Sequence, residues 1–461
     1  MLQVISPFTQ RLIKEIPLQG ITEAFAALTK AHGLFNDRLK WMPAWQRIGI
    51  LERVVAIMNT RIELLTNMAA EEGGKPYTDS KIEVERAING VKLAAEYISR
   101  LNGEQVPMGI NKSSENRLAF TMREPIGVVF SISAFNHPLN LVIHQTVTAI
   151  ATGCPVIIKP ASGTPLSCLN FADILIEAGL PEGWCQVIVC KNDVAEQLLA
   201  DERISYLSFI GSAKVGWYLR SKLAPGTRCA LEHGGAAPVI VEKDADLAGL
   251  LPSLLKGGFY HAGQVCVSVQ RVFIHEDICG SVANQLAGLA KKLVVGNPLD
   301  KKTEVGPLIT AKETDRVEEW VNEAIEKGAI LLCGGKRISA TCYEPTVLLD
   351  PPADARVSTL EVFGPVVCIY KYTDREEAIN RANSLNLHFQ ASVFTKDLDV
   401  ALDCVKKLNA TAVMVNDHTA FRVDWMPFGG RDASGMGMGG IPYTMHEMTR
   451  EKLMVIRSKV L

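Results

Sequence analysis

The chain lacks any large excess of charge and any long hydrophobic run. Its 48 Lys and Arg residues almost balance 50 Asp and Glu residues, for a net charge of −2. This balance gives no electrostatic reason to expect nucleic acid or an anionic membrane as a partner. No uninterrupted apolar run approaches the ~18 residues of a membrane span, and residues 1–7 have no basic region followed by an apolar core. We therefore expect a cytoplasmic protein without membrane contact.

The chain also lacks a disulfide framework and a metal-binding motif. Its eleven cysteines are an odd number, scattered along the sequence, which fits free thiols in a reducing compartment. Neither a Cys-x-x-Cys pair nor a His/Cys cluster with zinc spacing occurs, so the sequence implies no metal site. The composition, 48% hydrophobic and 21% charged, is typical of a globular enzyme-sized protein. At 461 residues, the chain exceeds what one hydrophobic core usually supports, so two or three lobes are expected.

The hydrophobic spacing predicts how the first half of the chain is organised. Up to about residue 101 the pattern is mostly helical, with helices expected at 44–66 and 81–101. Residues 104–122 are polar and predict a hairpin arm that meets another subunit. From 127 to 241, short apolar strands alternate with helices, which indicates a doubly wound parallel sheet. The strands are expected at 127–132, 155–159, 185–189, 206–210 and 228–231, with helices at 139–151 and from Pro165, where Thr164 is the predicted N-cap.

A second α/β lobe is predicted from residue 234 to about 427. Its expected helices include 281–292 and 314–327, and its expected strands include 366–370 and 391–394. The tail from 428 is glycine-rich and ends in an apolar run at 453–456. Residues 435–440 formally match G-x-G-x-x-G. We reject this match as a dinucleotide fingerprint, because no strand leads into it and no βαβ unit follows it, and we interpret it as a closely packed loop.

Polar residues fall at or just after the predicted strand ends, where parallel sheets bind ligands. They are Asn136, Lys159, Gly211 and Glu232. Gly211 precedes a helix, and backbone amides there can hold a pyrophosphate; alternatively, Gly211 only makes a tight turn. Lys159 could bond ribose hydroxyls, or it could be an ordinary surface lysine.

Cys266 is the candidate nucleophile. It lies in a Gly-Gln-Val-Cys turn between a predicted helix at 247–260 and an apolar strand at 271–274. A thiol nucleophile needs a group that activates it and a donor that stabilises the oxyanion it creates. Glu232 and Asn136 are the candidates for these two roles. The alternative is a buried structural cysteine.

Seven motifs in order make the chain similar to the aldehyde dehydrogenase superfamily over essentially its full length. They stand at 134–139, 159–161, 209–212, 231–235, 263–266, 361–365 and 427–430. The resemblance implies an α/β fold of two doubly wound, Rossmann-like domains with a small β bridging and oligomerisation arm, assembled as dimers or tetramers. The implied parts are a cofactor-binding domain (1–103 and 123–233), the arm (104–122 and 447–461), a catalytic domain (234–429) and a return segment (430–446).

The resemblance also implies catalytic roles. Cys266 would form a thiohemiacetal with the aldehyde, and the side chain of Asn136 with the backbone N–H of Cys266 would bind the oxyanion. Hydride transfer to the nicotinamide would leave a thioester, and Glu232 would activate the water that hydrolyses it. Because the members that transfer the acyl group to coenzyme A tend to lack this glutamate, the expected product is the free acid.

The cofactor implied by the resemblance is NAD or NADP. Lys159 would bind the adenosine ribose, Glu361 the nicotinamide ribose, and Phe363 would pack near the nicotinamide. Members that prefer NAD often carry glutamate at the position of Ser162, which would repel a 2′-phosphate. Serine removes this repulsion, so we expect NADP to be tolerated or preferred. The remaining residues of the implied cofactor site are Ile132, Ser133, Gly211 and Ser212.

The substrate implied by the resemblance is an aldehyde, and His137 and Arg422 are the candidates for binding it. Arg422 could hold an anionic tail; it could instead pair with Asp417 or Asp424, or make a subunit contact. The segment around it is similar to members that oxidise small polar or anionic aldehydes.

Two neighbouring positions bear on this choice. Arg86 is a weaker second candidate for an anion. Val265 is an arginine in some members with phosphate-bearing substrates, so its identity counts against a dianionic phosphate and favours a short, polar or monoanionic aldehyde. His233 replaces a common leucine beside Glu232, either as a packed residue or as one that tunes the base.

Two other functions are alternatives to aldehyde oxidation. Cys266 and Glu232 alone would suffice for a cofactor-independent thioesterase or esterase. A catalytically silent, scaffolding member of the fold is the alternative outside enzymes.

Overall fold

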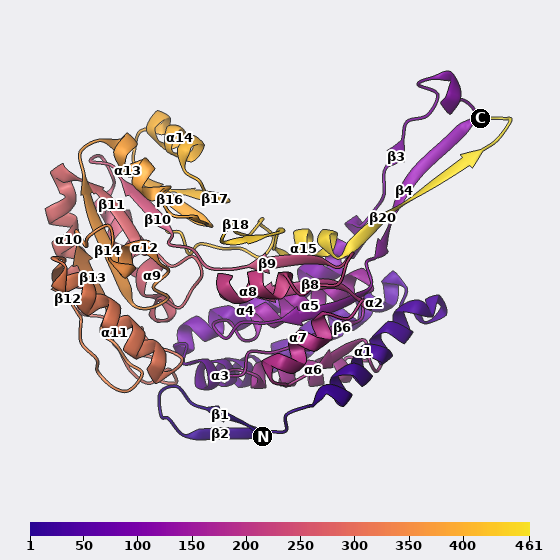
Figure 1. Ribbon diagram of the computed structural model, residues 1–461, viewed down its shortest axis with the longest axis horizontal. Helices are drawn as coiled ribbons and strands as arrows, with labels where there is room; N and C mark the ends of the chain where they lie inside the picture. Colours follow the sequence, from indigo (N-terminus) through magenta and orange to yellow (C-terminus); the bar gives the residue numbers. More distant parts are fainter.

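Two separate sheets organise the computed structural model, which describes residues 1–461 (Figure 1). The first sheet has six strands in the order β19-β9-β8-β5-β6-β7, and all but β19 run parallel. Its continuous apolar strands are buried on both faces, as the sequence predicts. The strands are β5 (Val128–Ile132), β6 (Val156–Lys159), β7 (Cys185–Val187), β8 (Ile204–Ile210), β9 (Arg228–Glu232) and β19 (Gly435–Met436).

Helices cover both faces of this sheet, each through its own hydrophobic cluster. One face packs against α2 (Ala44–Thr60), α4 (Tyr77–Tyr97), α5 (Asn140–Thr152), α6 (Leu166–Glu177) and α15 (Ile441–Glu447). The other face packs against α1 (Ile21–Asn36), α7 (Asn192–Leu199) and α8 (Ala213–Arg220). The doubly wound prediction is therefore confirmed.

The second sheet has seven strands in the order β12-β13-β14-β11-β10-β16-β17, parallel except for β12 at one edge. It has a separate hydrophobic core, so the two lobes bury their apolar side chains independently. Its strands are β10 (Pro238–Val241), β11 (Arg271–His275), β12 (Ile330–Cys333), β13 (Thr346–Leu349), β14 (Val366–Tyr372), β16 (Gln390–Phe394) and β17 (Ala412–Val415). Its helices are α9 (Leu247–Phe259), α10 (Glu276–Ala290), α11 (Ala311–Glu326), α12 (Arg356–Thr359), α13 (Arg375–Ala382) and α14 (Leu398–Lys407).

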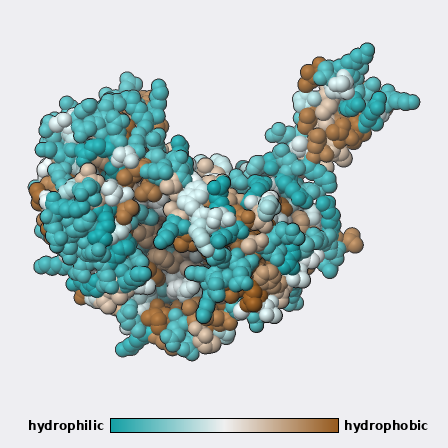
Figure 2. All heavy atoms as spheres, viewed as in Figure 1, coloured by the Kyte–Doolittle hydropathy of each residue, from teal (hydrophilic) through white to brown (hydrophobic).

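A three-stranded antiparallel arm projects away from both lobes (Figure 1). It consists of β3 (Gln105–Val106), β4 (Arg117–Pro125) and β20 (Thr449–Arg457). Strand β20 pairs with the whole length of β4. Four large apolar side chains of β20 are exposed, namely Leu453, Met454, Val455 and Ile456, and hydrophobic side chains gather on the arm in Figure 2.

The N-terminal quarter differs from the sequence prediction. Residues expected to be helical begin instead with a hairpin of β1 (Leu2–Ile5) and β2 (Leu12–Ile16). The helix predicted at 44–66 is two helices, α2 and α3 (Ile62–Gly73), because Arg61 leaves the helical region at φ −119°. No helix is both long and apolar enough to cross a membrane.

The start of α6 was also predicted wrongly. It begins at Leu166, and the side chain of Thr164 does not cap it. The buried carboxylate of Glu72 does so from α3, accepting hydrogen bonds from the backbone N–H groups of Leu166 (2.7 Å) and Ser167 (2.8 Å). A cap supplied by another helix leaves no signal in the local sequence.

The remaining short elements connect these parts. Strands β15 (Leu387–His388) and β18 (Arg431–Asp432) pair with each other. Strand β19, within the Gly-rich segment 435–440, pairs with β9 next to Glu232, and a Cβ on Gly435 would lie 2.1 Å from the carbonyl oxygen of Leu231. The segment is therefore closely packed, as expected. The 3₁₀ turns are η1 (Arg38–Lys40), η2 (Ile98–Arg100), η3 (Lys112–Ser114) and η4 (Tyr260–Gly263).

Candidate functional site

Strand order in the first sheet reverses between β5 and β8, because β5 leads to β6 and β7 while β8 leads the other way to β9. Open parallel sheets bind ligands beyond the carboxyl ends of the strands at such a point. Ile132 ends β5 and Ser133 follows it, Lys159 ends β6, and Gly211 and Ser212 lead from β8 into α8. The structure thus brings five predicted cofactor residues to one edge.

Buried polar groups at this edge have no partner in the protein. Ser133 is 6% exposed, yet its hydroxyl makes no hydrogen bond. Lys159 is equally buried, and burial lowers its pKa. Glu361 has an unpaired buried oxygen, and burial raises its pKa to about 8. Since buried polar groups are nearly always paired, these residues fit a ligand rich in hydroxyl and phosphate groups, as a dinucleotide is.

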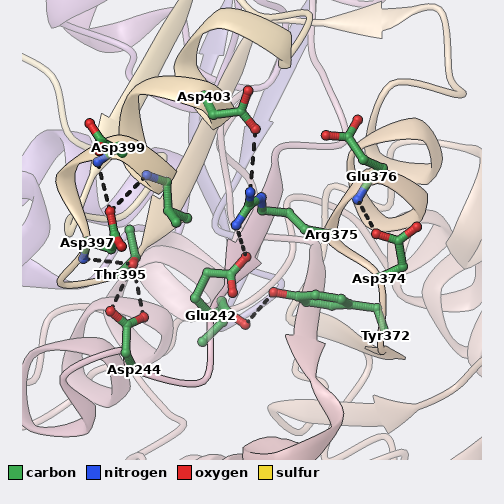
Figure 3. A network of polar contacts seen from close by, with 12 residues as sticks. Glu242, Asp244, Tyr372, Asp374, Arg375, Glu376, Thr395, Asp397, Asp399 and Asp403 are labelled. Atoms are coloured by element: carbon green, nitrogen blue, oxygen red, sulfur yellow. Dashed lines mark hydrogen bonds and ion pairs between the residues drawn. The ribbon is translucent and has the colours of Figure 1, made fainter.

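The strand order of the second sheet also reverses, between β10 and β16. The polar side chains beyond the ends of these strands already bond to one another (Figure 3). The hydroxyl of Thr395 donates to Asp244 (2.9 Å). Arg375 lies 3.6 Å from Glu242 and 3.7 Å from Asp403. The carboxylates outnumber the one arginine in this network, so its charge disfavours a phosphate. Of the two edges, that of the first sheet is the better fit for a dinucleotide.

Three successive left-handed residues shape the turn before Cys266. His261, Ala262 and Gly263 have φ values of 48°, 54° and 69°. Side chains seldom adopt this conformation, and each such residue costs about 1–3 kcal/mol unless its surroundings enforce it. A Cβ on Gly263 would lie 2.0 Å from the carbonyl oxygen of Gly364, so only glycine fits there.

The side chain of Gln264 holds this turn in its left-handed conformation. Its side-chain nitrogen donates to the carbonyls of His261 (3.3 Å) and Pro307 (3.2 Å), and its side-chain oxygen accepts from the backbone of Ile309 (2.9 Å). The side chain is 1% exposed. The Gly-Gln part of the motif therefore holds the turn in its strained shape, while Cys266 remains only half-buried.

Asn136 is attached to the same turn. Its side-chain nitrogen donates to the carbonyl oxygen of Gln264 at 3.0 Å, which joins the loop after β5 to the loop before β11. An amide nitrogen has two hydrogens, so the second one is available to an oxygen bound near Cys266. A free N–H of this kind is what an oxyanion donor must supply.

Glu232 reaches the site from the end of β9. Three residues later, the backbone N–H of Gly235 donates to the carbonyl oxygen of Cys266 at 3.1 Å. Burial raises the pKa of Glu232, and the positive charge of Arg422 opposes this shift. Burial and the nearby Glu232 raise the pKa of Cys266 well above that of a free thiol. Cys266 is therefore a thiol at rest, and it could act as a nucleophile only after losing its proton.

Arg422 lies beside Glu232 rather than beside Asp417 or Asp424. Its Nη1 is 4.0 Å from Oε1 of Glu232, and its guanidinium stacks 3.6 Å from the ring centre of Phe428. Its Nε is buried without a hydrogen-bond partner. Arg422 is thus a buried cation with unused donor capacity next to the nucleophile.

Arg86 does not offer such capacity. Its Nε and Nη2 donate to the two carboxylate oxygens of Asp424 at 3.1 and 2.7 Å. Asp424 also accepts from His144 at 2.8 Å. The guanidinium of Arg86 is therefore already paired within the protein. This ion pair holds Asp424, and with it the segment that carries Arg422.

The other predicted residues fall around this centre. His137 is buried with Nε2 3.2 Å from the hydroxyl of Tyr260, and burial lowers its pKa well below its usual value, so it is neutral. Phe363, at φ 46°, meets Phe135 edge to face. Ser162 is exposed on the loop after β6.

His233 is a packed residue. It lies edge-on to Phe209 and Trp217, each with ring centres 5.7 Å apart, and its Nδ1 donates to the carbonyl oxygen of Gly211 (3.0 Å). The sequence left two interpretations of His233 open, a packed residue or one that tunes Glu232, and these contacts favour the packed residue. It links the turn at Gly211 to the residue next to Glu232.

Sequence reasoning missed several buried polar residues that support the site. Glu83 accepts from the backbone N–H groups of Leu139 and Asn140 and pairs with the buried Lys75, so it fixes the helix that follows Asn136. Charged residues on the apolar face of α4 were the available signal. Gln145 was missed because a glutamine within a helix carries no motif.

The fold and the site define a class of protein: a two-sheet α/β enzyme with a thiol beside a dinucleotide-binding edge. The model of the aldehyde dehydrogenase family matches residues 1–454. The 3-sulfolactaldehyde dehydrogenase of Priestia aryabhattai is 39% identical over 457 residues, covering 99% of this chain and 94% of the relative. The chain belongs to the aldehyde dehydrogenase family and is an NAD(P)-dependent oxidoreductase acting on aldehydes.

Solved structures agree with this assignment. Aldehyde dehydrogenase 21 from Physcomitrella patens, in complex with its reaction product succinate, has a TM-score of 0.96 at 36% identity, covering 99% of this chain and 95% of that one. The glyceraldehyde-3-phosphate dehydrogenase of Methanocaldococcus jannaschii, complexed with NADP, has a TM-score of 0.95 at 38% identity and covers 99% of both chains. These relatives are dehydrogenases, which supports neither the esterase nor the scaffolding alternative.

Proposed function

We propose that this enzyme oxidises a short polar or monoanionic aldehyde to its free carboxylic acid, with Cys266 as the nucleophile. The observation that supports the proposal is that hydrogen bonds join the loops after β5 and β9 to the turn of Cys266, from Asn136 to Gln264 and from Gly235 to Cys266. We infer that Asn136, Glu232 and Cys266 surround one point. Beside that point lies the buried cation Arg422.

The first half of the reaction forms a bond to sulfur. The proton of the Cys266 thiol passes to solvent as the sulfur adds to the aldehyde carbon. The carbonyl oxygen becomes an oxyanion, which accepts hydrogen bonds from the side chain of Asn136 and the backbone N–H of Cys266; one such donor is worth about 10²–10³ in rate. Bound NAD or NADP supplies the acceptor for the hydride that leaves this carbon.

The second half removes the acyl group from sulfur. Glu232, as a carboxylate, takes a proton from water and later returns it to the sulfur of Cys266. The water oxygen adds to the thioester carbon, the carbon–sulfur bond breaks, and the acid leaves. Because the base directs water to the thioester, the product is the free acid.

Each predicted cofactor residue would contact one part of the dinucleotide. Lys159 and Glu361 would hold the two riboses, Ile132 and Ser133 would line the edge, and Gly211 and Ser212 would face the pyrophosphate at the start of α8. Phe363 would pack near the nicotinamide. The residues of the first sheet, 1–103 and 123–233, would form the cofactor-binding domain, 234–429 the catalytic domain, 104–122 and 447–461 the arm, and 430–446 the return segment.

Arg422 is expected to select an anionic substrate. Relatives are named for sulfolactaldehyde and lactaldehyde, and one was solved with succinate. Replacing Arg422 by Gln should lower kcat/KM for succinic semialdehyde about 10–100-fold, the worth of a hydrogen bond to a charged group. The same variant should change kcat/KM for butanal, which lacks the carboxylate, only a few-fold. Arg228→Gln, a change away from the site, is the control, and an equal loss on both aldehydes would make Arg422 a structural residue.

Ser162 is expected to permit NADP. Replacing it by Glu places a carboxylate where a 2′-phosphate would approach Lys159. We expect the ratio of kcat/KM for NADP to that for NAD to fall by about tenfold or more. Steady-state kinetics with both cofactors measures this, with Ser162→Gln as the uncharged control. An unchanged ratio in Ser162→Glu would refute the role of this position.

The arm is expected to join copies into a homodimer or homotetramer. Leu453 and Val455 are 54% and 49% exposed, and exposed apolar side chains in a row mark interaction surfaces. The double change Leu453→Lys and Val455→Lys should shift the mass measured by light scattering toward that of the monomer, 50.3 kDa. An unchanged mass would place the interface elsewhere.

All eleven cysteines are unpaired, which supports a reducing compartment such as the cytoplasm.

A further inference from the structure

A small recess adjoins Glu232. It is enclosed by β8, β9, α5 and the Gly-rich segment 436–439. The cavity volume is about 30 Å³, whereas about 10–15 Å³ is enough for one water molecule. Its polar lining comes from His144, Gln145, Ser208, Glu232 and Thr444. The recess therefore has both the room and the partners for one or two waters.

Gln145 presents an unused acceptor there. Its side-chain nitrogen donates to the carbonyl oxygens of Ile132 (3.1 Å) and Ser208 (2.9 Å), which fixes how the amide is turned. Its side-chain oxygen has no partner, although the residue is 1% exposed. Leaving a buried acceptor unpaired costs about 1–3 kcal/mol, so a donor is expected in the recess.

His144 presents a second acceptor. Its Nε2 lies 2.8 Å from the carboxylate of Asp424. A carboxylate only accepts, so Nε2 carries the hydrogen and Nδ1 is left as an acceptor. Burial, together with the positive charges of Arg86 and Arg422, lowers the pKa of His144, against the effect of Asp424. The ring is therefore neutral.

We propose that the recess is a water site, and that its waters donate to the Glu232 carboxylate and to Gln145, holding the base ionised and in position for the acyl-enzyme. Gln145 and His144 are then positioning residues. This inference rests on the proposed role of Glu232 as the base.

The charges around Glu232 show why such donors matter. Burial disfavours its carboxylate form, and the charged group that acts on it is Arg422, 4.0 Å away. Its other titratable neighbour is the neutral Cys266 thiol, whose pKa Glu232 helps to raise. Hydrogen bonds donated to a carboxylate favour the ionised form. Without the waters, the base would be protonated at higher pH, and thioester hydrolysis would slow near neutral pH while acylation remained.

The test uses p-nitrophenyl acetate without cofactor, in which the burst reports acylation of Cys266 and the steady phase reports deacylation. Gln145→Met removes the side-chain acceptor of Gln145. Thr444→Leu places a larger side chain in the recess and leaves Gln145 unsubstituted. Gln186→Met is the matched control, since Gln186 bonds backbone carbonyls at the far edge of the same sheet. Glu232→Gln is the reference for loss of the base.

We expect both recess variants to keep the burst rate, to slow the steady phase about tenfold, and to move its acid limb up by about one pH unit, within the 10²–10⁴ that a general base contributes. A high-resolution crystal structure of the wild type should show ordered water in the recess. A dry recess, or variants that match Gln186→Met in rate and pH profile, would overturn the inference while Glu232→Gln still slowed deacylation. A normal steady phase in Glu232→Gln would instead overturn the proposed function.

Discussion

Replacing Cys266 by Ala should abolish NAD(P)H formation, lowering kcat at least about 10⁴-fold, as in other enzymes that lose a covalent nucleophile. The reason is structural: Asn136 donates to the carbonyl of Gln264, two residues before Cys266, and the charge of Glu232 acts on the Cys266 thiol. Absorbance at 340 nm with an aldehyde and either cofactor measures the loss. Hydrolysis of p-nitrophenyl acetate should disappear with it.

The control for this change is Cys229→Ala. Cys229 is also half-buried and lies on β9, three residues before Glu232, but its sulfur contacts the sulfur of Met436 at 3.7 Å. It should retain close to full activity. Residual activity of Cys266→Ala near that of Cys229→Ala would remove the covalent mechanism.

Replacing Glu232 by Gln should separate the two halves of the reaction. Thioester hydrolysis loses its general base, which is worth about 10²–10⁴ in rate. In the wild type, burial raises the pKa of Glu232, so the base form is lost as the pH falls through a value above that of an ordinary glutamate. The variant should lose this acid limb, and product release from the acyl-enzyme should become the slow step.

Rapid mixing distinguishes this outcome from a general loss of activity. Where acylation can still occur, NAD(P)H should appear as a burst of about one equivalent per active site, followed by a much slower phase. If the burst and the slow phase were reduced in the same proportion, Glu232 would act mainly in forming the thiohemiacetal.

The sequence predicts the part of the site that depends on strand ends. Apolar runs ending in Ile132, Lys159 and Ile210 identify parallel strands, and the topology of such a sheet brings those ends to one edge. Neighbouring polar residues could therefore be predicted to meet without knowing any side-chain contact.

The groups that fix the site could not be predicted in this way. Glu72 and Glu83 cap α6 and α5 from other helices, and these contacts exist only after the helices pack. The left-handed backbone at His261 and Ala262 is held by the side chain of Gln264, which is itself anchored to the carbonyl of Pro307, a residue distant in sequence. Tertiary contacts override local propensity at these positions.

Arg422 shows the same limit for charge pairing. Asp424 is its nearest acid in sequence, but Asp424 is taken by Arg86 and His144 from two other helices. Arg422 therefore turns to Glu232, on another strand. Glu232 was not among the partner acids suggested from the sequence, Asp417 and Asp424.

The most direct test of the account is the mass of the protein during turnover. Glu232→Gln should be mixed with succinic semialdehyde and NADP, quenched in acid within the burst, and analysed as the intact chain and as peptides. The account predicts the added mass of one succinyl group, carried by the peptide containing Cys266. An unmodified chain after a full burst, or an acyl group on another residue, would contradict it.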